Sequence, residues 1–343
     1  MKSYHVKNGG GLASLIVKEH DIPVPGPHEV LLRVRAASFN YRESLILRGT
    51  YPLPVKEPDV IPLADGAGEI VATGPDVTRA KPGDRVVVNS LVKWLDGPFV
   101  GWEEYGTQLS GTLDGLLTEY IVLSEETVLP IPEHLSYEEA ATLPVAAVTA
   151  WNALTGIRLP QPGETILTLG SGGVSLFALQ FAKSFGAHVI ATTSSADKVE
   201  RLKKLGADEV INTRSIPNWH EAVRELTGGR GTDLVVENTN PGTLEQSIKA
   251  TAISGQVSVV GWIPSNVSTM DISAFYFNLV TLRPLMTGSR AQFLAMNHFI
   301  AHHELRPVID RIFPFDDARA AFQYYEEARP FGKVVISQRS VSL

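Results

Sequence analysis

The sequence predicts an α/β protein with a doubly wound parallel sheet and a second, β-rich domain. Three observations support this fold class. Between residues 165 and 260, short apolar runs typical of strands alternate with segments of helical periodicity. Gly170, Gly172 and Gly173 stand where the first of these runs passes into a helical pattern. Residues 1–124 carry short alternating runs separated by Pro and Gly turns instead.

The composition restricts the classes of protein and partner. A chain of 343 residues is long enough for two domains, and 44% hydrophobic with 20% charged residues is ordinary for a globular protein. The net charge of −7 gives no reason to expect binding to nucleic acid or to an anionic membrane. No apolar run approaches the roughly 18 residues of a membrane span. The first 20 residues lack signal-peptide features, so we expect a cytoplasmic protein.

The chain has no cysteine. This excludes disulfides, thiolate zinc sites, iron–sulfur clusters and a cysteine nucleophile.

The first part of the chain reads as a small barrel or sandwich. Residues 29–36 and 84–88 are strand-like, and Pro/Gly turns occupy 24–27 and 81–84. Residues 91–111 have no clear period, and we expect an irregular surface loop there. The pattern changes near residue 125, where we place the domain boundary.

The second part alternates between strands and helices. We expect a helix over 132–154 and a closing strand over 333–337. The expected parallel strands are 165–169, 188–191, 209–211, 233–237, 256–260 and a sixth within 279–288. The expected helices between and after them are 174–185, 219–226, 244–250, 292–304 and 315–328. This order indicates a doubly wound sheet over 125–288.

The glycine turn predicts dinucleotide binding. Glycines let the backbone approach a pyrophosphate, and the N–H groups at a helix start hold the anion. The order strand, turn, helix and strand is the context that such a motif requires. Ser175 takes the place of the third glycine and is small enough for close packing of helix and strand. The residues assigned to the pyrophosphate are Gly170, Ser171, Gly172, Gly173 and Val174.

The end of the second strand favours NADP(H) over NAD(H). NAD-preferring sites carry an acid there for the ribose 2′-hydroxyl. This chain has hydroxyls at Thr193, Ser194 and Ser195, followed by Lys198, which suits a 2′-phosphate. Asp197 is the discordant residue, although it could cap the following helix.

Several short segments in register resemble the medium-chain dehydrogenase/reductase superfamily. They are 23–29, 49–52, 60–68, 81–86, 114–120, 205–208 and 331–335. The resemblance implies a GroES-like barrel domain made of residues 1–124 and 289–343. It also implies a Rossmann domain over 125–288 and a homodimer formed through the sixth strand.

The resemblance also separates zinc-dependent from zinc-free members. Zinc-dependent alcohol dehydrogenases carry a cysteine near Asn40, a histidine at about Ala64 and a cysteine near Val145. They also have a four-cysteine loop where residues 91–111 lie. Because none of these ligands is present, the chain is similar to the zinc-free branch of quinone oxidoreductases and enoyl or enone reductases. No metal site is expected.

The family's chemistry supplies the expected function. A reduced nicotinamide can pass hydride to a quinone or to the β-carbon of an activated alkene without a metal. Hydrogen-bond donors then stabilise the developing enolate. Tyr51 stands where enoyl reductases carry a tyrosine that donates to the substrate, and Asn40 lies in a loop that lines the family's cleft. The expected substrate is a small electrophile, either a quinone or an α,β-unsaturated carbonyl.

Further cofactor contacts are carried over from the family by position. Gly261 and Trp262 follow the fifth strand, and Ser289 with Arg290 matches a turn after the sixth. The other assigned residues are Thr149, Asn212, Phe331, Gly332 and Lys333.

Two alternatives remain open from the sequence: a metal-free NADP-dependent alcohol or aldehyde dehydrogenase, and an NADPH-binding structural or regulatory protein with little turnover. His298 and His302, four residues apart, are read as an exposed helical face rather than as metal ligands.

Overall fold

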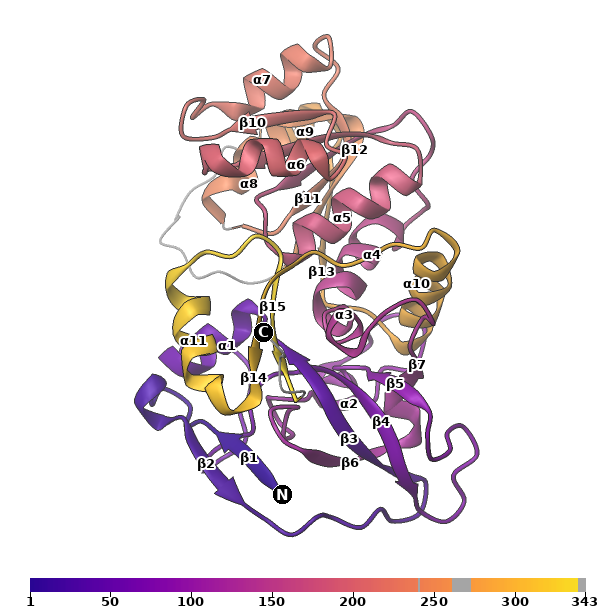
Figure 1. The fold of residues 1–343 in the computed structure, drawn as a ribbon. Helices are drawn as coiled ribbons and strands as arrows, with labels where there is room; N and C mark the ends of the chain where they lie inside the picture. The colour runs from indigo at the N-terminus through magenta and orange to yellow at the C-terminus, as the bar shows by residue number, and fades with distance from the viewer. Residues whose placement is uncertain (240, 261–272, 339–343) are drawn as a thin grey trace. The chain divides into compact units, whose positions relative to one another are not determined.

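The computed structural model describes residues 1–239, 241–260 and 273–338, and the chain divides into two compact units. The first unit combines Met1–Val148 with the segment from Gly288 onward, and the second is Thr149–Thr287. In Figure 1 the indigo-to-violet strands labelled β3 and β4 and the yellow strands labelled β14 and β15 therefore belong to one sheet.

The first unit is built on a seven-stranded sheet in the order β14-β15-β3-β4-β5-β7, with β6 also paired to β3. Its strands are β3 (Glu29–Ser38), β4 (Asp65–Thr73), β5 (Arg85–Val88), β6 (Tyr120–Ser124), β7 (Val128–Pro130), β14 (Ile309–Pro314) and β15 (Lys333–Ser337). A separate hairpin pairs β1 (Lys2–His5) with β2 (Ile16–Glu19). The antiparallel pairing of β15 with β3 sets Val335 opposite Ser38, which brings the last strand beside the loop at Asn40.

The first unit also contains helices and short turns. The helices are α1 (Tyr41–Arg48), α2 (Trp102–Tyr105), α3 (Tyr137–Ala140), α10 (Arg290–His302) and α11 (Ala318–Glu327). Short 3-10 turns lie at Leu12–Ser14, Glu125–Thr127 and Phe315–Asp317. Phe39 and Phe322 meet edge to face with ring centroids 4.7 Å apart in the core, a geometry that aromatic pairs favour.

The single helix expected over 132–154 is wrong. A capping box of Ser136 and Glu139 starts α3, which ends at Ala140, and a π-helical segment (Leu143–Ala147) precedes α4 (Val148–Thr155). Pro144 explains the break, because proline has no N–H to donate to the carbonyl four residues earlier. The unit boundary also lies later than residue 125, because α3 packs on β3, β4 and β15 of the first unit.

The second unit has a six-stranded parallel sheet in the order β10-β9-β8-β11-β12-β13. Counted along the chain this order is 3-2-1-4-5-6, the doubly wound arrangement that the sequence predicts. The strands are β8 (Thr165–Leu169), β9 (His188–Thr193), β10 (Glu209–Asn212), β11 (Thr232–Glu237), β12 (Thr251–Val260) and β13 (Thr281–Leu285). The expected sixth strand is therefore confirmed, and it forms one edge of the sheet.

The helices of the second unit pack on these strands. They are α4, α5 (Gly173–Ser184), α6 (Val199–Lys204), α7 (Trp219–Leu226), α8 (Pro241–Ala250) and α9 (Ser273–Phe277), with a 3-10 turn at Ala196–Lys198 before α6. Helix α5 lies on β8 and β9 and buries Phe177 and Phe181. Gly186 follows it with a φ of +80°, the left-handed conformation that commonly ends a helix.

Candidate functional site

A small cavity lies at the carboxyl ends of the first four strands of the parallel sheet. Its volume is about 150 Å³. Ligands of doubly wound proteins bind at this edge, near the point where the strand order reverses, here between β8 and β11. The lining consists largely of small and hydroxyl-bearing residues. They are Leu169, Gly170, Thr192, Thr193, Ser194, Thr213, Trp219, Thr239 and Thr243.

The glycine turn beside this cavity has the conformation that a phosphate site requires. Gly170 has a φ of +79°, which a side chain would strain, and its N–H donates to the carbonyl of Thr192 at 3.0 Å. Gly172 precedes α5, and no side chain caps the first turn of that helix. A Cβ atom built on Gly172 would meet no protein atom within 4 Å. Open space in front of uncapped N–H groups fits the pyrophosphate of a dinucleotide.

Ser175 does more than replace a glycine. Its side chain is buried, its hydroxyl donates to the carbonyl of Leu169 at 2.6 Å, and it accepts from Nδ2 of Asn238 at 2.8 Å. These contacts join the start of α5 to the ends of β8 and β11. The sequence pattern indicated only that serine is small enough, because one of the two hydrogen bonds comes from Asn238, 63 residues away.

A buried carboxylate orders the threonines of the cavity. Glu237 ends β11 and accepts hydrogen bonds from the Thr239 hydroxyl at 2.6 Å and the Thr243 hydroxyl at 2.9 Å. Its second oxygen accepts from Ser247 at 2.5 Å. Sequence reasoning missed this cluster. An acid at a strand end followed by hydroxyls at positions +2, +6 and +10 is the signal that could have indicated it.

The predicted 2′-phosphate residues differ in how accessible they are. Thr193 is buried, and its hydroxyl accepts from the Ser195 N–H at 3.2 Å, so it shapes the turn after β9. The Ser195 hydroxyl donates to Asp197, and this bond lowers the pKa of that carboxyl. Asp197 therefore holds the turn, whereas Ser194 is exposed and Lys198 is half-buried. β9 ends without an acidic residue, as the sequence shows.

Among the remaining predicted cofactor residues of the second unit, the described ones, Thr149 and Asn212, do not line the cavity. Thr149 is buried near the start of α4. The side-chain oxygen of Asn212 accepts from the Arg214 N–H at 3.0 Å at the end of β10. Gly261 and Trp262 lie outside the described residues. The assignment of these positions to the cofactor stays a prediction.

Two predicted cofactor residues of the first unit have structural partners within it. Ser289 caps α10 by accepting from the Gln292 N–H at 3.2 Å. The Arg290 guanidinium donates to the carbonyl of Glu126 at 2.8 Å, and burial lowers the pKa of this side chain. Phe331 and Gly332 are buried directly before β15. Their contact with a cofactor also stays a prediction.

Lys333, the last residue assigned to the cofactor, is only 3% exposed. Its ammonium donates to Oδ1 of Asn40 at 2.7 Å, to Oδ2 of Asp65 at 3.0 Å and to the carbonyl of Phe39. Ser38 also donates to Oδ2 of Asp65, at 3.0 Å. Burial lowers the pKa of Lys333 and raises the pKa of Asp65, and the attraction between the two charges opposes both shifts.

Tyr51, the second predicted catalytic residue, follows the C-terminal end of α1, whereas Asn40 precedes its start. Its hydroxyl donates to Oε1 of Gln108 at 3.0 Å, and the Arg42 guanidinium lies 4.9 Å from the centre of its ring. The Gln108 Nε2 is buried without a hydrogen-bond partner. Tyr51 and Gln108 therefore form a polar pair with one donor still available, and Gln108 is a site candidate that the sequence did not reveal.

Glu43 is a fully buried acid in the same region. One of its oxygens accepts from the Ser110 hydroxyl at 3.1 Å, and the other has no partner. Burial raises the pKa of this carboxyl, and the nearby Arg42 charge opposes the shift.

The positions of the family's catalytic zinc ligands do not fit a zinc ion in this chain. Ala64 offers no donor atom, and Val145 is equally inert. The Asn40 oxygen already accepts from the Lys333 ammonium, whose positive charge would repel a second cation. Within residues 1–239, 241–260 and 273–338, no three His, Asp or Glu side chains are placed to hold a metal.

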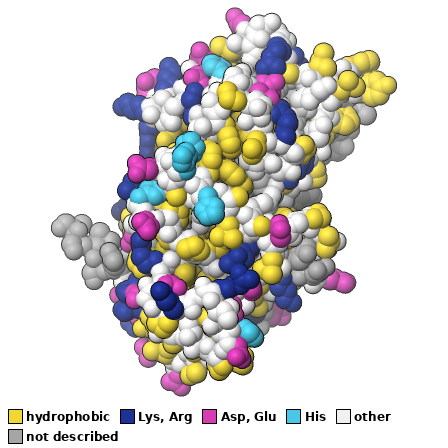
Figure 2. Space-filling view, turned by 90° about the vertical axis from the view of Figure 1, so that its right-hand side faces the viewer, with side chains coloured by type: hydrophobic (Ala, Val, Ile, Leu, Met, Phe, Trp, Pro, Cys, Tyr) yellow, Lys and Arg dark blue, Asp and Glu magenta, His cyan; other side chains and the backbone are white. Residues whose placement is uncertain are grey.

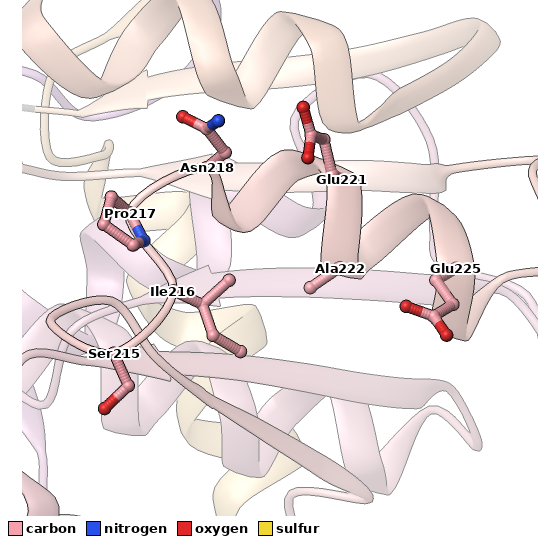
Figure 3. A pocket seen from close by; sticks show the side chains of 7 residues that line it. All are labelled: Ser215, Ile216, Pro217, Asn218, Glu221, Ala222 and Glu225. Carbon is pink, nitrogen blue, oxygen red and sulfur yellow. The ribbon is translucent and has the colours of Figure 1, made fainter.

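Other surface features lie apart from these residues. A shallow hollow of about 440 Å³ opens at the start of α7, and Figure 3 shows Glu221 and Glu225 of that helix at its wall. None of its lining residues is a predicted site residue. His298 and His302 are exposed on α10, and Figure 2 shows histidines (cyan) on the face of the molecule that carries this helix. In the described part of the chain, no helix combines the length and apolar character needed to cross a bilayer.

Comparison with known proteins identifies the family. The alcohol dehydrogenase GroES-like domain matches residues 26–133, and the zinc-binding dehydrogenase family matches residues 173–302. A zinc-type alcohol dehydrogenase-like protein of Schizosaccharomyces pombe is 40% identical over 95% of this chain and 96% of its own length. The chloroplastic quinone-oxidoreductase QR1 of Triphysaria versicolor is 32% identical over 96% and 95% of the two chains.

Solved structures agree with these relatives. An NAD-dependent alcohol dehydrogenase superposes with a TM-score of 0.89 and 34% identity, covering 99% of this chain and 100% of the other. The 2-octenoyl-CoA carboxylase reductase CinF, solved with NADP and 2-octenoyl-CoA, gives a TM-score of 0.85 at 26% identity over 98% and 87% of the chains. With its parallel 3-2-1-4-5-6 sheet and its GroES-like unit, the chain belongs to the medium-chain dehydrogenase/reductase superfamily of oxidoreductases, which bind a nicotinamide cofactor.

Proposed function

We propose that this protein is a zinc-independent, NADPH-dependent reductase that transfers hydride to a quinone or an α,β-unsaturated carbonyl. The observation that carries the proposal is the set of side chains at the zinc-ligand positions. Where zinc-dependent relatives have metal ligands, this chain has Asn40 bonded to a buried ammonium, and Ala64. Without a Lewis acid, oxidation of a simple alcohol lacks the usual electrostatic support for the alkoxide that gives up hydride. A conjugated acceptor needs only hydrogen-bond donors, because it spreads the incoming charge itself.

NADP(H) is the proposed cofactor, and it would supply the hydride. β9 ends without an acid, and Ser194 and Lys198 stand where a 2′-phosphate would need a donor and a positive charge. The reductase CinF was solved in complex with NADP, which supports this choice by analogy. The similar NAD-dependent alcohol dehydrogenase supports the other choice. We choose NADP(H) because the sequence at the end of β9 has no acidic residue and offers Ser194 and Lys198 instead.

The first unit offers donors for the substrate. The buried Gln108 amide nitrogen has no hydrogen-bond partner, and the buried Asn40 amide has at least one N–H without an acceptor. The Tyr51 hydroxyl is half-buried beside Gln108. We assign Tyr51 and Asn40 to the substrate oxygen, where negative charge develops as the C=C electron pair shifts. The α-carbon then takes a proton from water, which completes the reduction. Gln108 holds the Tyr51 hydroxyl in position in the absence of substrate.

A metal-free NADP-dependent alcohol or aldehyde dehydrogenase is the second candidate. It is favoured by the names of the relatives, since several are called alcohol dehydrogenases. The donor set at Asn40 favours the reductase, and substrate tests separate the two.

A homodimer formed through β13 is part of the proposal. β13 is an edge strand, and an edge offers unpaired backbone groups to a second copy. Large apolar side chains are exposed on the adjoining segments, with Ile253 at 69% and Leu279 at 65% exposure. Tyr276 and Phe277 of α9 are exposed as well. Sedimentation of the protein would test the dimer, and cell fractionation would test the expected cytoplasmic location.

The deciding experiment follows NADPH oxidation with EDTA present. The substrates are a benzoquinone, a naphthoquinone, a 2-alkenal, a cyclic enone and a simple ketone. We expect turnover of the conjugated substrates and none of the ketone. NADP⁺ reduction by an alcohol in chelator-treated protein would favour the second candidate. Tight NADPH binding without any turnover would indicate a nucleotide-binding protein with a structural or regulatory role.

A further inference from the structure

Asn40 departs from the usual behaviour of its position. It is the N-cap residue of α1, where an asparagine oxygen normally accepts from a backbone N–H of the first turn. Its side chain makes no such bond. Its oxygen accepts instead from the Lys333 ammonium at 2.7 Å, across 293 residues of sequence. Asn40 thus gives up the usual capping bond of its helix for a contact with a charged residue far away in the sequence, and such departures are expected at functional positions.

The contact with Lys333 fixes the direction of the amide group. An ammonium has donors only, so the oxygen of Asn40 and not its nitrogen must face Lys333. The nitrogen therefore points away from the ammonium. It is buried and contributes a hydrogen bond to the Asp65 carboxylate that lowers the pKa of that group, although the contact falls outside normal hydrogen-bond geometry, so at least one of its two N–H groups has no acceptor. A buried N–H without an acceptor is costly unless a ligand accepts from it.

Lys333 in turn is held rigidly. Its three donors meet three acceptors, the Phe39 carbonyl, Asn40 and Asp65, and both charged side chains are almost completely buried. Ser38 completes the partners of the Asp65 oxygen that faces the ammonium. Such a network cannot rotate without losing a charge-assisted bond. Asn40 is therefore presented by a fixed support rather than by its own loop.

We propose that Lys333, supported by Asp65, is a positioning residue that locks the Asn40 amide so that its Nδ2–H donates to the carbonyl oxygen of the substrate. The inference rests on the proposed reductase function. As hydride from NADPH adds to the β-carbon, the C=C electron pair moves toward the carbonyl and negative charge collects on its oxygen. The ammonium polarises the amide and strengthens its N–H as a donor at that moment. The α-carbon then takes a proton, NADP⁺ is formed, and no metal is required.

The test is a mutant cycle measured with a cyclic enone and NADPH. Asp65→Asn is the matched background, because it removes the buried carboxylate that Lys333→Met would otherwise leave unpaired. We expect Asn40→Ala to lower kcat about 100-fold, the usual effect of deleting one oxyanion donor. Asp65→Asn/Lys333→Met should lower kcat about 10-fold relative to Asp65→Asn, since methionine has no N–H to donate to the Asn40 oxygen. In both cases the NADPH Kd stays unchanged.

Non-additivity identifies the role of Lys333. If Lys333 acts through Asn40, adding Lys333→Met to an Asn40→Ala, Asp65→Asn background changes kcat no further. If the fold-decreases in kcat caused by Asn40→Ala and Lys333→Met multiply in full, the inference is overturned. So does an unchanged kcat in Asp65→Asn/Lys333→Met. A weaker NADPH Kd that accounts for the loss overturns it as well and returns Lys333 to the cofactor.

A second variant keeps the test decisive if the charge-free pair does not fold. Lys333→Arg keeps a positive charge opposite Asp65, but its planar guanidinium cannot reproduce the contact that the ammonium makes. It should lower kcat when Asn40 is present and leave it unchanged in an Asn40→Ala background. Equal effects in both backgrounds contradict the inference. A wild-type protein that turns over no quinone or enone contradicts the proposed function itself, and that result is distinct from any difference among variants.

Discussion

Restoring the missing glycine of the nucleotide motif should weaken the protein. Ser175→Gly would recreate the third glycine of the pattern, yet the Ser175 hydroxyl makes two hydrogen bonds in a buried position, to Leu169 and from Asn238. Each such bond contributes about 1 kcal/mol net, and a buried partner left without one adds to the loss. Glycine in a helix costs up to about 1 kcal/mol more. We therefore expect unfolding of the second unit to become easier by about 2–3 kcal/mol, the sum of these terms.

The assay is thermal unfolding followed by calorimetry, with NADPH affinity measured in parallel. A loss of this size lowers Tm by about 5–10 °C in a domain of this length. Ser184→Gly is the matched control, because Ser184 lies in the same helix and its hydroxyl donates only to Gln180, four residues earlier. The control should show little beyond the glycine cost. If Ser175→Gly were as stable as the wild type and bound NADPH more tightly, the two hydrogen bonds would contribute nothing to the free energy of unfolding, and our reasoning would be refuted.

Three further predictions concern the site and the buried acid. Tyr51→Phe should lower enone turnover and leave the NADPH Kd nearly unchanged; undiminished steady-state turnover would make Tyr51 a packing residue. Lys198→Ala should weaken NADPH much more than NADH in binding titrations, and an equal loss for both would reject its contact with a 2′-phosphate. Burial raises the pKa of Glu43 above its ordinary value of 4.5, so the folded state holds the carboxyl proton more tightly than the unfolded chain does. The stability of the folded state therefore falls as the pH rises from 4.5 to the raised pKa. The Tm of Glu43→Gln should therefore decline less than that of the wild type between about pH 5 and pH 8, and parallel curves would contradict the shift.

The local part of the fold could be predicted from the sequence. The strand at 165–169, the glycine turn and the helix after it are specified by residues close together, and the structure confirms all three. The regular spacing of apolar runs also indicated the doubly wound sheet, since each strand of such a sheet is buried on both faces. The helix over 132–154 failed because one proline in an Ala-rich stretch removed a backbone donor without changing the apolar pattern.

The candidate site was predictable only in its separate residues. Asn40, Tyr51 and Lys333 were identified by position, but the hydrogen bond between Asn40 and Lys333 spans 293 residues and follows from strand pairing. The hydrogen bond between Tyr51 and Gln108 could not be predicted either. The loop that supplies Gln108 has no regular apolar pattern, so the sequence does not indicate where this loop packs. Side-chain partners across a fold depend on which distant segments pair, and neither segment shows this by itself, as with β15 and β3.

The place of β15 between β14 and β3 has a consequence for the order in which parts of the chain can fold. One edge of β3 is shared, with β6 covering Glu29–Arg33 and β15 covering Ala36–Ser38. During synthesis, therefore, the segment that carries Asn40 leaves the ribosome long before β15 does. The second unit is one continuous stretch, Thr149–Thr287, and can close while part of the β3 edge is still bare. Nascent protein arrested before residue 333 should hence acquire a protease-resistant nucleotide-binding unit, with the other unit still open to cleavage and to chaperones.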